Sequence, residues 1–158
     1  MKLVAKKDVE APAAFVFRQL TDFEGWERAA MRRGAEVVRT DKLSQPGPGM
    51  AWDTQFTYRG KDRRASLRVD QMVHNASLVM SATSVPVNGM MQIDIIDLAA
   101  RRTRIELRME VKPNTLAARL LLQSLRLARS RVERNFDQRV AQLAVEIEDR
   151  YRRSQRQG

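Results

Sequence analysis

Residues 103–125 read TRIELRMEVKPNTLAARLLLQSL and contain a change of hydrophobic period that decides the fold. Up to Val111, apolar residues alternate with mostly charged ones, which is the pattern of a strand with one packed face. The segment 113–115 ends this strand with a proline and supplies a threonine suited to capping a helix. From Leu116 to about Arg153 there is no proline or glycine, and apolar residues recur at steps of mostly three and four. We therefore predict one continuous amphipathic helix of about 57 Å after the last strand.

The two-residue period also marks the chain before this strand. Its clearest instance is residues 50–58, where every second side chain from Met50 to Tyr58 belongs to one row. Turn signals such as the SQPGPG stretch at 44–49 separate the runs. The predicted strands are residues 2–9, 36–40, 50–58, 65–73, 78–82, 91–95 and 103–111. Short strands joined by hairpins predict an antiparallel sheet with one packed face and one solvated face.

Two short helices are predicted between the first and second strands. Pro12 suits the first turn of a helix over Ala13–Leu20. The pair Thr21-Asp22 resembles an N-cap before a second helix, which we expect to end at Gly34. We expect Trp26 and Ala29 or Ala30 to face inward.

The opening of the chain resembles many bacterial members of the START-related, birch-pollen-allergen-like superfamily, often called SRPBCC. The likeness is carried by Val9-Glu10-Ala11-Pro12, Phe15-Val16-Phe17, Leu20-Thr21-Asp22-Phe23 and Trp26-Glu27. The resemblance implies an α+β helix-grip fold, in which a curved antiparallel sheet of about six to seven strands wraps round one long C-terminal helix. The likeness extends over residues 2–150. A chain of 158 residues has the size of one ordinary domain, so we expect residues 1–158 to form a single domain, with 152–158 as a frayed polar tail.

Members of this superfamily bind lipids, sterols, polyketides, quinones or plant hormones between sheet and helix, and some are polyketide cyclases. The resemblance therefore implies a cavity for a small hydrophobic molecule such as a lipid, a quinone or a polyketide-like compound. The expected lining comes from the inward rows of the sheet and the first half of the long helix: Trp52, Thr54, Phe56, Tyr58, Leu67, Val69, Gln71, Leu78, Met80, Met91, Ile93, Leu107, Met109, Leu120, Ser124 and Leu125. The alternative is that these rows pack against each other as ordinary core.

Four of these candidates, Thr54, Tyr58, Gln71 and Ser124, carry polar groups that would orient a ligand or else satisfy a neighbouring backbone group. The superfamily also contains enzymes, so a polyketide cyclase or dehydratase is an alternative function. Its acid or base would be His74, Tyr58 or an inward carboxylate, but His74 belongs to an expected hairpin turn. We assign no catalytic residue. No cysteine and only one histidine are present, so we expect no metal site and no cofactor.

The formal net charge is +10, from 29 Lys and Arg against 19 Asp and Glu. A basic adaptor for RNA, the ribosome or another protein is therefore a second alternative function. The alternative is that the charge only keeps the protein soluble. No block of five like charges occurs, and the helix arginines do not form one stripe, so a solvated face is favoured and nucleic-acid binding is not expected. The apolar stripe of the second helix half, Val140, Leu143, Ile147 and Tyr151, would be exposed if the helix outran the sheet, which suggests a homodimer through this helix or burial against a partner. The alternative is that the sheet or the N-terminal helices cover this stripe. No signal peptide or membrane-spanning stretch is recognisable, and we expect a cytoplasmic protein.

Overall fold

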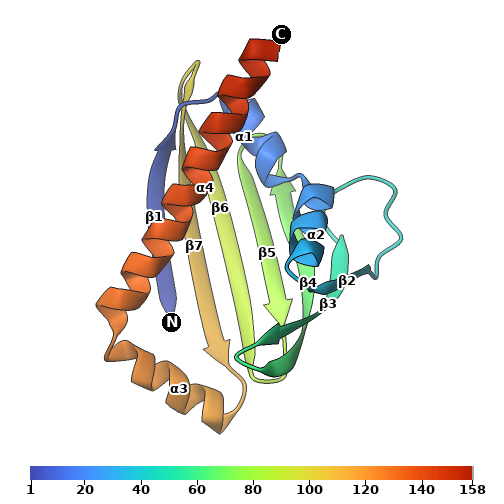
Figure 1. Ribbon diagram of the computed structural model, residues 1–158, viewed down its shortest axis with the longest axis vertical. Coiled ribbons are helices and arrows are strands. Elements are labelled where there is room, and N and C mark those ends of the chain that lie inside the picture. Colours follow the sequence, from blue (N-terminus) through green and yellow to red (C-terminus); the bar gives the residue numbers. More distant parts are fainter. Residues whose placement is uncertain (158) are drawn as a thin grey trace.

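The computed structural model describes residues 1–157 and contains seven strands and four helices in this range (Figure 1). In chain order the elements are β1 (Lys2–Val9), α1 (Ala13–Leu20), α2 (Phe23–Arg32), β2 (Glu36–Arg39), β3 (Ala51–Tyr58), β4 (Lys61–Val73), β5 (Ser77–Thr83), β6 (Val87–Ala99), β7 (Arg102–Pro113), α3 (Leu116–Arg126) and α4 (Arg129–Gln157). All neighbouring strands are antiparallel, in the order β1-β7-β6-β5-β4-β3-β2. The predicted strands and both N-terminal helices are therefore confirmed.

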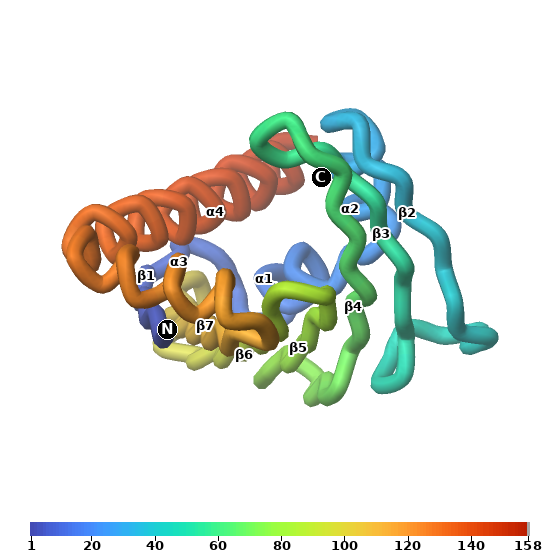
Figure 2. Tube along the Cα trace, turned by 90° about the horizontal axis from the view of Figure 1, so that it is seen from below, coloured from blue at the N-terminus to red at the C-terminus, as the bar shows by residue number. Residues whose placement is uncertain are grey.

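The sheet is strongly curved. Viewed from one end in Figure 2, β5, β6, β7 and β1 form a floor, and β4, β3 and β2 rise at one side. The helix α4 crosses opposite the floor, α1 contacts β6 and β7, and α2 contacts β2. Register shifts between Val69 and Gln71 in β4 and between Asp97 and Ala99 in β6 are β-bulges, which increase the local twist of a strand. The architecture is a helix-grip fold, as the resemblance implies.

The prediction of one continuous C-terminal helix is wrong, because the chain turns sharply between α3 and α4. The amides of Leu127 and Ala128 donate to the carbonyls of Ser124 and Leu125, which are the tight bonds of a 3₁₀ turn. Helix α3 packs against β7, whereas α4 packs against β1. The two helices cover different strands, so the chain must bend between them. The bend contains no proline or glycine, so no residue type marks it in the sequence. Its cause is the packing of the two helices on different strands.

The apolar stripe of α4 is covered. Val140, Ala144 and Ile147 are buried, and the helix packs against β1 and α1. The rings of Phe15 on α1 and Tyr151 on α4 meet edge to face, with centroids 5.1 Å apart. The sequence left open whether Val140, Leu143, Ile147 and Tyr151 are exposed or covered by the sheet and the N-terminal helices. The structure shows that they are covered, because β1 and α1 pack along the helix. A homodimer through this helix stays a prediction. Its basis was an exposed apolar stripe, and the structure shows that this stripe is covered.

The last polar residues continue the helix. Residues 152–157, for which the sequence predicts a frayed tail, form the end of α4, and Arg152 pairs with Asp149 one turn earlier. Gly158, the final residue of the predicted tail, lies outside the described residues.

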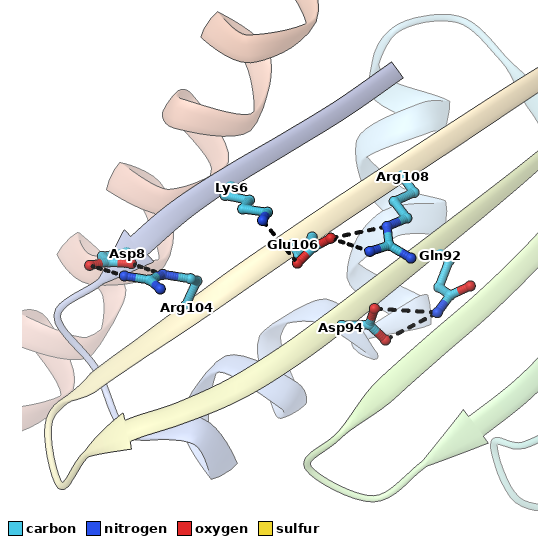
Figure 3. A network of polar contacts seen from close by, with 7 residues as sticks. All are labelled: Lys6, Asp8, Gln92, Asp94, Arg104, Glu106 and Arg108. Atoms are coloured by element: carbon cyan, nitrogen blue, oxygen red, sulfur yellow. Dashed lines mark hydrogen bonds and ion pairs between the residues drawn. The ribbon is translucent and has the colours of Figure 1, made fainter. Parts of the chain in front are cut away.

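A polar network on the outer face ties the edge strand β1 to β7 (Figure 3). Asp8 on β1 accepts hydrogen bonds of 2.8 Å from both Arg104 and Arg102 on β7. Farther along the same strand pair, Glu106 lies between Lys6 and Arg108. The hydrogen bonds from Arg104 and then Arg102 lower the pKa of Asp8 to about 2, from an ordinary value of 3.8.

This pKa predicts how acid affects the attachment of β1. Because the folded-state pKa is below the unfolded one, the Asp8 carboxylate stabilises the fold above about pH 4, and this contribution is lost as the pH falls towards 2. We expect Asp8→Asn to unfold at lower urea than the wild type at neutral pH, with the difference shrinking on acidification. Asp97→Asn is the control, because Asp97 has no ion pair within residues 1–157. A difference independent of pH would contradict the assignment.

Candidate ligand-binding site

An apolar cavity of about 330 Å³ lies between α2, the inner face of the sheet and α4. It is half enclosed and lined by Leu20, Phe23, Trp26, Glu27, Ala30, Val37, Trp52, Thr54, Leu67, Leu78, Met80, Met91, Ile93, Leu107 and Leu143. A larger hollow of about 590 Å³, which includes Glu36, Asp53 and Arg64, is more open and more polar. Cavities that hold small apolar ligands are concave and mainly hydrocarbon-walled, so the α2–sheet cavity is the candidate site.

The floor of the cavity follows from strand register. Leu78 on β5 pairs with Ile93 on β6, and Ile93 pairs with Leu107 on β7. Directly opposite residues on antiparallel strands share a face, so these three side chains form one ladder pointing into the cup. Met80 and Met91 form the next rung. The alternation seen in the sequence thus becomes a continuous apolar wall.

Eight of the sixteen residues predicted to line a cavity do so. They are Trp52, Thr54, Leu67, Leu78, Met80, Met91, Ile93 and Leu107. The only polar member, Thr54, donates its hydroxyl to the carbonyl oxygen of Ala65 at 2.9 Å. The hydroxyl hydrogen of Thr54 is therefore bonded within the sheet. This is the alternative expected for the polar candidates, in which the side chain satisfies a neighbouring backbone group instead of a ligand.

Four further candidates from β3 and β4 lie outside the cavity. Phe56 and Tyr58 share the inner row of Trp52, but the β3–β4 hairpin runs past the helices and leaves them 38% and 56% exposed. Val69 is fully buried within the core. The bulge after Val69 shifts the register by one residue, so Gln71 is exposed. A bulge of this kind changes which face a side chain occupies.

The remaining four candidates lie near α3. Met109 is half-buried on β7 beyond the cavity, and Leu125 is half-buried on α3. Leu120 is 57% exposed, and Ser124 is exposed with its hydroxyl donating to the carbonyl oxygen of Leu121. Leu120, Ser124 and Leu125 miss the cavity because the bend at residues 127–128 turns α3 away from the line of α4.

The sequence-based lining omitted the wall supplied by α2. Phe23, Trp26, Glu27 and Ala30 recur at helical spacing and lie on one face of α2. Asp22 caps this helix by accepting the Gly25 amide at 3.1 Å, which confirms the predicted N-cap. The spacing of Phe23, Trp26 and Ala30 was the signal that could have identified this wall. Leu20, Val37 and Leu143 complete the set that was missed.

Both indole rings of the chain line the cavity, and both have their N–H groups satisfied. Trp26 Nε1 donates to the carbonyl oxygen of Leu20 at 3.1 Å, and Trp52 Nε1 donates to Glu27 Oε1 at 2.8 Å. The Phe23 ring lies 5.5 Å from the Trp52 ring, and the Arg39 guanidinium lies 5.8 Å from it. The tryptophans therefore present hydrocarbon rather than free donors to the cavity.

Arg39 is itself anchored at the edge of the site. It forms an ion pair with Asp41, whose carboxylate also accepts the amides of Ala51 and Leu43 at 2.9 Å each. The Arg39 hydrogen bond is the main reason that the pKa of Asp41 lies well below its usual range. Trp52 thus lies close both to Phe23 and to a cation held in place by a carboxylate.

The histidine lies away from the cavity. His74 is exposed at the turn after β4, and its ring meets the Phe17 ring edge to face at 5.3 Å. Within residues 1–157, no group of three His, Cys, Asp or Glu side chains is placed to hold a metal ion. No helix in that range is long and apolar enough to cross a membrane.

Comparison with solved structures shows the same fold in several proteins. The Zhui aromatase/cyclase of Streptomyces sp. R1128 is 18% identical, with a TM-score of 0.69 over 95% of this chain and 94% of that chain. A START superfamily protein of Mycobacterium smegmatis is 15% identical, with a TM-score of 0.55 over 90% and 98%. The protein Ara h 8.0201 is 10% identical, with a TM-score of 0.59 over 73% and 79%. At these identities the likeness establishes the fold alone.

Sequence comparison identifies the family. No curated protein sequence matches the chain. The sequence pattern of one family, described as polyketide cyclase / dehydrase and lipid transport, matches residues 1–148. That match covers nearly every described element and agrees with the superfamily resemblance of the opening residues. The chain therefore belongs to the polyketide cyclase / dehydrase and lipid transport family.

Proposed function

We propose that the protein binds a small, uncharged apolar molecule in the cavity between α2, the sheet and α4. The observation that carries this proposal is the wall itself: of the residues that line the cavity, only Glu27 is charged, and the Thr54 hydroxyl is already bonded. The family description, which includes lipid transport, supports the same class of ligand. A lipid, a quinone or a polyketide-like compound fits these requirements.

The affinity of such a site comes from removing apolar surface from water. Each 100 Å² of apolar ligand surface buried contributes about 2.5 kcal/mol before the cost of immobilising the ligand. Methionines at Met80 and Met91 adapt to ligands of different outline, because their side chains are unbranched and flexible. Binding of an uncharged ligand by these walls is expected to change little with salt concentration.

Tryptophan fluorescence tests this proposal directly. The chain has two tryptophans, Trp26 and Trp52, and both line the cavity, so all tryptophan emission reports on its contents. We expect titration with menadione and with lauryl alcohol to give a saturable change in emission that is the same at low and high salt. A response that rises linearly without saturation for both compounds would contradict the proposal.

A second candidate function, cyclase chemistry, rests on Glu27, the one carboxylate that lines the cavity. Its Oε1 atom accepts the Trp52 indole N–H, which fixes the carboxylate beside the apolar wall. A carboxylate in this position can accept a proton from the carbon between two carbonyl groups of a polyketide-like chain. The resulting enolate attacks another carbonyl carbon farther along the same chain, which forms a carbon–carbon bond and turns that carbonyl into an alkoxide. The protonated Glu27 then returns its proton to this alkoxide. Neither His74 nor Tyr58 lines the cavity.

The variant Glu27→Gln separates the two functions. Glutamine keeps an oxygen that accepts the Trp52 indole N–H, so we expect affinity for lauryl alcohol to stay within about threefold. If Glu27 moves protons, cyclisation of a synthetic poly-β-ketone thioester will fall about a hundredfold or more. Glu24→Gln is the matched control, because Glu24 lies on the same helix and outside the cavity. Unchanged turnover in Glu27→Gln would eliminate the cyclase mechanism.

A further inference from the structure

Helix α3 and its C-cap residue Leu127 expose an unusual amount of apolar surface. Leu116 is 72% exposed, Leu120 57%, Leu121 55% and Leu127 93%. The β5–β6 turn at the same end of the molecule adds Val85, which is 84% exposed. A cluster of aliphatic side chains with such high solvent exposure indicates a surface that another molecule covers when the protein functions.

The positive charge of the chain gathers at the same end. Figure 1 places α3, the β5–β6 turn and the tip of the β3–β4 hairpin at one end of the fold, opposite the C-terminus. Residues 56–64 and 112–131 hold nine of the 29 cationic side chains and one of the 19 acidic ones. These two segments therefore carry +8 of the formal net charge of +10. We call this surface, made of residues 56–64, 83–87 and 112–131, the α3 end.

Few of these cations are neutralised within the fold. Arg129 pairs with Glu133 at 2.7 Å, and Lys112 lies 3.8 Å from Glu110. Across residues 1–157, no carboxylate lies within ion-pair distance of Arg119, Arg126 or Arg131. The arginines of this segment are thus available to an external anion while the leucines beside them are exposed.

This combination is typical of a helix that lies in a membrane interface. Such helices bury leucines at the boundary of headgroups and acyl chains while arginines contact anionic lipid phosphates. Helix α3 has eleven residues and no acidic side chain, so it is about 16 Å long and suited to lying on a bilayer rather than spanning it. RNA would use the arginines but would gain nothing from the exposed leucines, which favours a lipid surface.

We propose that the α3 end docks the protein on an anionic lipid bilayer. The leucines of α3 enter the interface, and Arg119, Arg126 and Arg131 contact lipid phosphates. The docking surface is separate from the cavity, since no residue of the α3 end lines it. Failure of this proposal would leave the ligand-binding proposal unaffected.

Vesicle flotation measures the docking. The wild-type protein is expected to float with phosphatidylcholine vesicles that contain phosphatidylglycerol, less with pure phosphatidylcholine, and less at high salt. The variant Arg119→Gln, Arg126→Gln, Arg131→Gln removes three charges from the α3 end. We expect it to bind anionic vesicles about a hundredfold more weakly, at about one kcal/mol for each arginine lost.

A matched variant removes the same charge from the opposite end of the molecule. Arg152, Arg153 and Arg156 are exposed near the C-terminus. The triple variant Arg152→Gln, Arg153→Gln, Arg156→Gln has the same net charge as the first one, and we expect it to bind vesicles like the wild type. Circular dichroism establishes that both variants keep their helices. Equal loss of binding in the two variants would overturn the proposal, because only net charge would then matter.

Fluorescent probes at single positions test whether the leucine surface enters the bilayer. The chain has no cysteine, so Leu127→Cys and Val145→Cys each carry one label. Val145 is 52% exposed on α4, outside the α3 end. With a polarity-sensitive fluorophore, we expect a blue shift on vesicle addition at position 127 and none at position 145.

Three further results would overturn the docking proposal. The first is no blue shift at position 127 with anionic vesicles. The second is salt-dependent binding of RNA without vesicle binding, which would assign the α3 end to nucleic acid. The third is a blue shift at position 127 that grows with protein concentration in the absence of vesicles, which would assign the surface to a second copy of the chain.

Discussion

Replacing Ile147 with alanine is expected to lower the free energy of unfolding by about 3 kcal/mol. Ile147 is completely buried on the face of α4 that packs into the core. Its truncation removes three carbon atoms from the core and leaves a void at the point where the C-terminal helix grips the sheet. Urea unfolding monitored by circular dichroism measures the loss as a shift of the midpoint.

Val145→Ala is the matched control for this prediction. Val145 lies two residues away on the same helix and is 52% exposed. Its truncation is expected to change the free energy of unfolding by about 0.5 kcal/mol or less. Equal losses at positions 145 and 147 would mean that α4 does not pack on β1 and α1 as described.

Enlarging Ala30 to leucine is expected to weaken ligand binding at least tenfold and to leave the fold as stable as before or more stable. Ala30 lies on the α2 wall of the cavity. Leucine adds three carbon atoms, which take volume from a cavity of about 330 Å³ and give its walls new contacts. Filling a cavity in this way commonly adds about 1 kcal/mol to stability. Affinity is therefore expected to fall without any loss of stability.

The variant Ala29→Leu separates this effect from a general change in α2. Ala29 is half-buried on the same helix but does not line the cavity. We expect its affinity for lauryl alcohol, followed by tryptophan emission, to match that of the wild type. Loss of affinity in both variants, or in neither, would show that the ligand does not occupy the α2–sheet cavity.

The strands were predictable because their signal is local. In an antiparallel sheet with one packed face, burial alternates from residue to residue, and the rows containing Trp52, Leu78 and Leu107 show that alternation in the sequence. Pairing of Leu78, Ile93 and Leu107 across three strands then follows from short hairpins. The floor of the candidate site was accordingly anticipated residue by residue.

The rest depended on packing that no local pattern records. The bend at residues 127–128 arises because α3 and α4 cover different strands, and it removes Leu120, Ser124 and Leu125 from the cavity. The bulge after Val69 displaces Gln71, since one extra residue inverts the alternation. The helical wall of the cavity comes from α2 instead of α3, and Trp26 of α2 is both partly exposed and part of this wall.

The central claim, that this cavity holds an apolar molecule, is tested most directly by native mass spectrometry of the protein purified from its own host. Gentle ionisation retains a bound ligand, and solvent extraction then identifies its chemical class. We predict a one-to-one apolar adduct on the wild type that is absent from Ala30→Leu and present on Ala29→Leu. An adduct retained equally by both variants, or an empty wild-type protein that also gives no saturable tryptophan response to lauryl alcohol or menadione, would contradict the account.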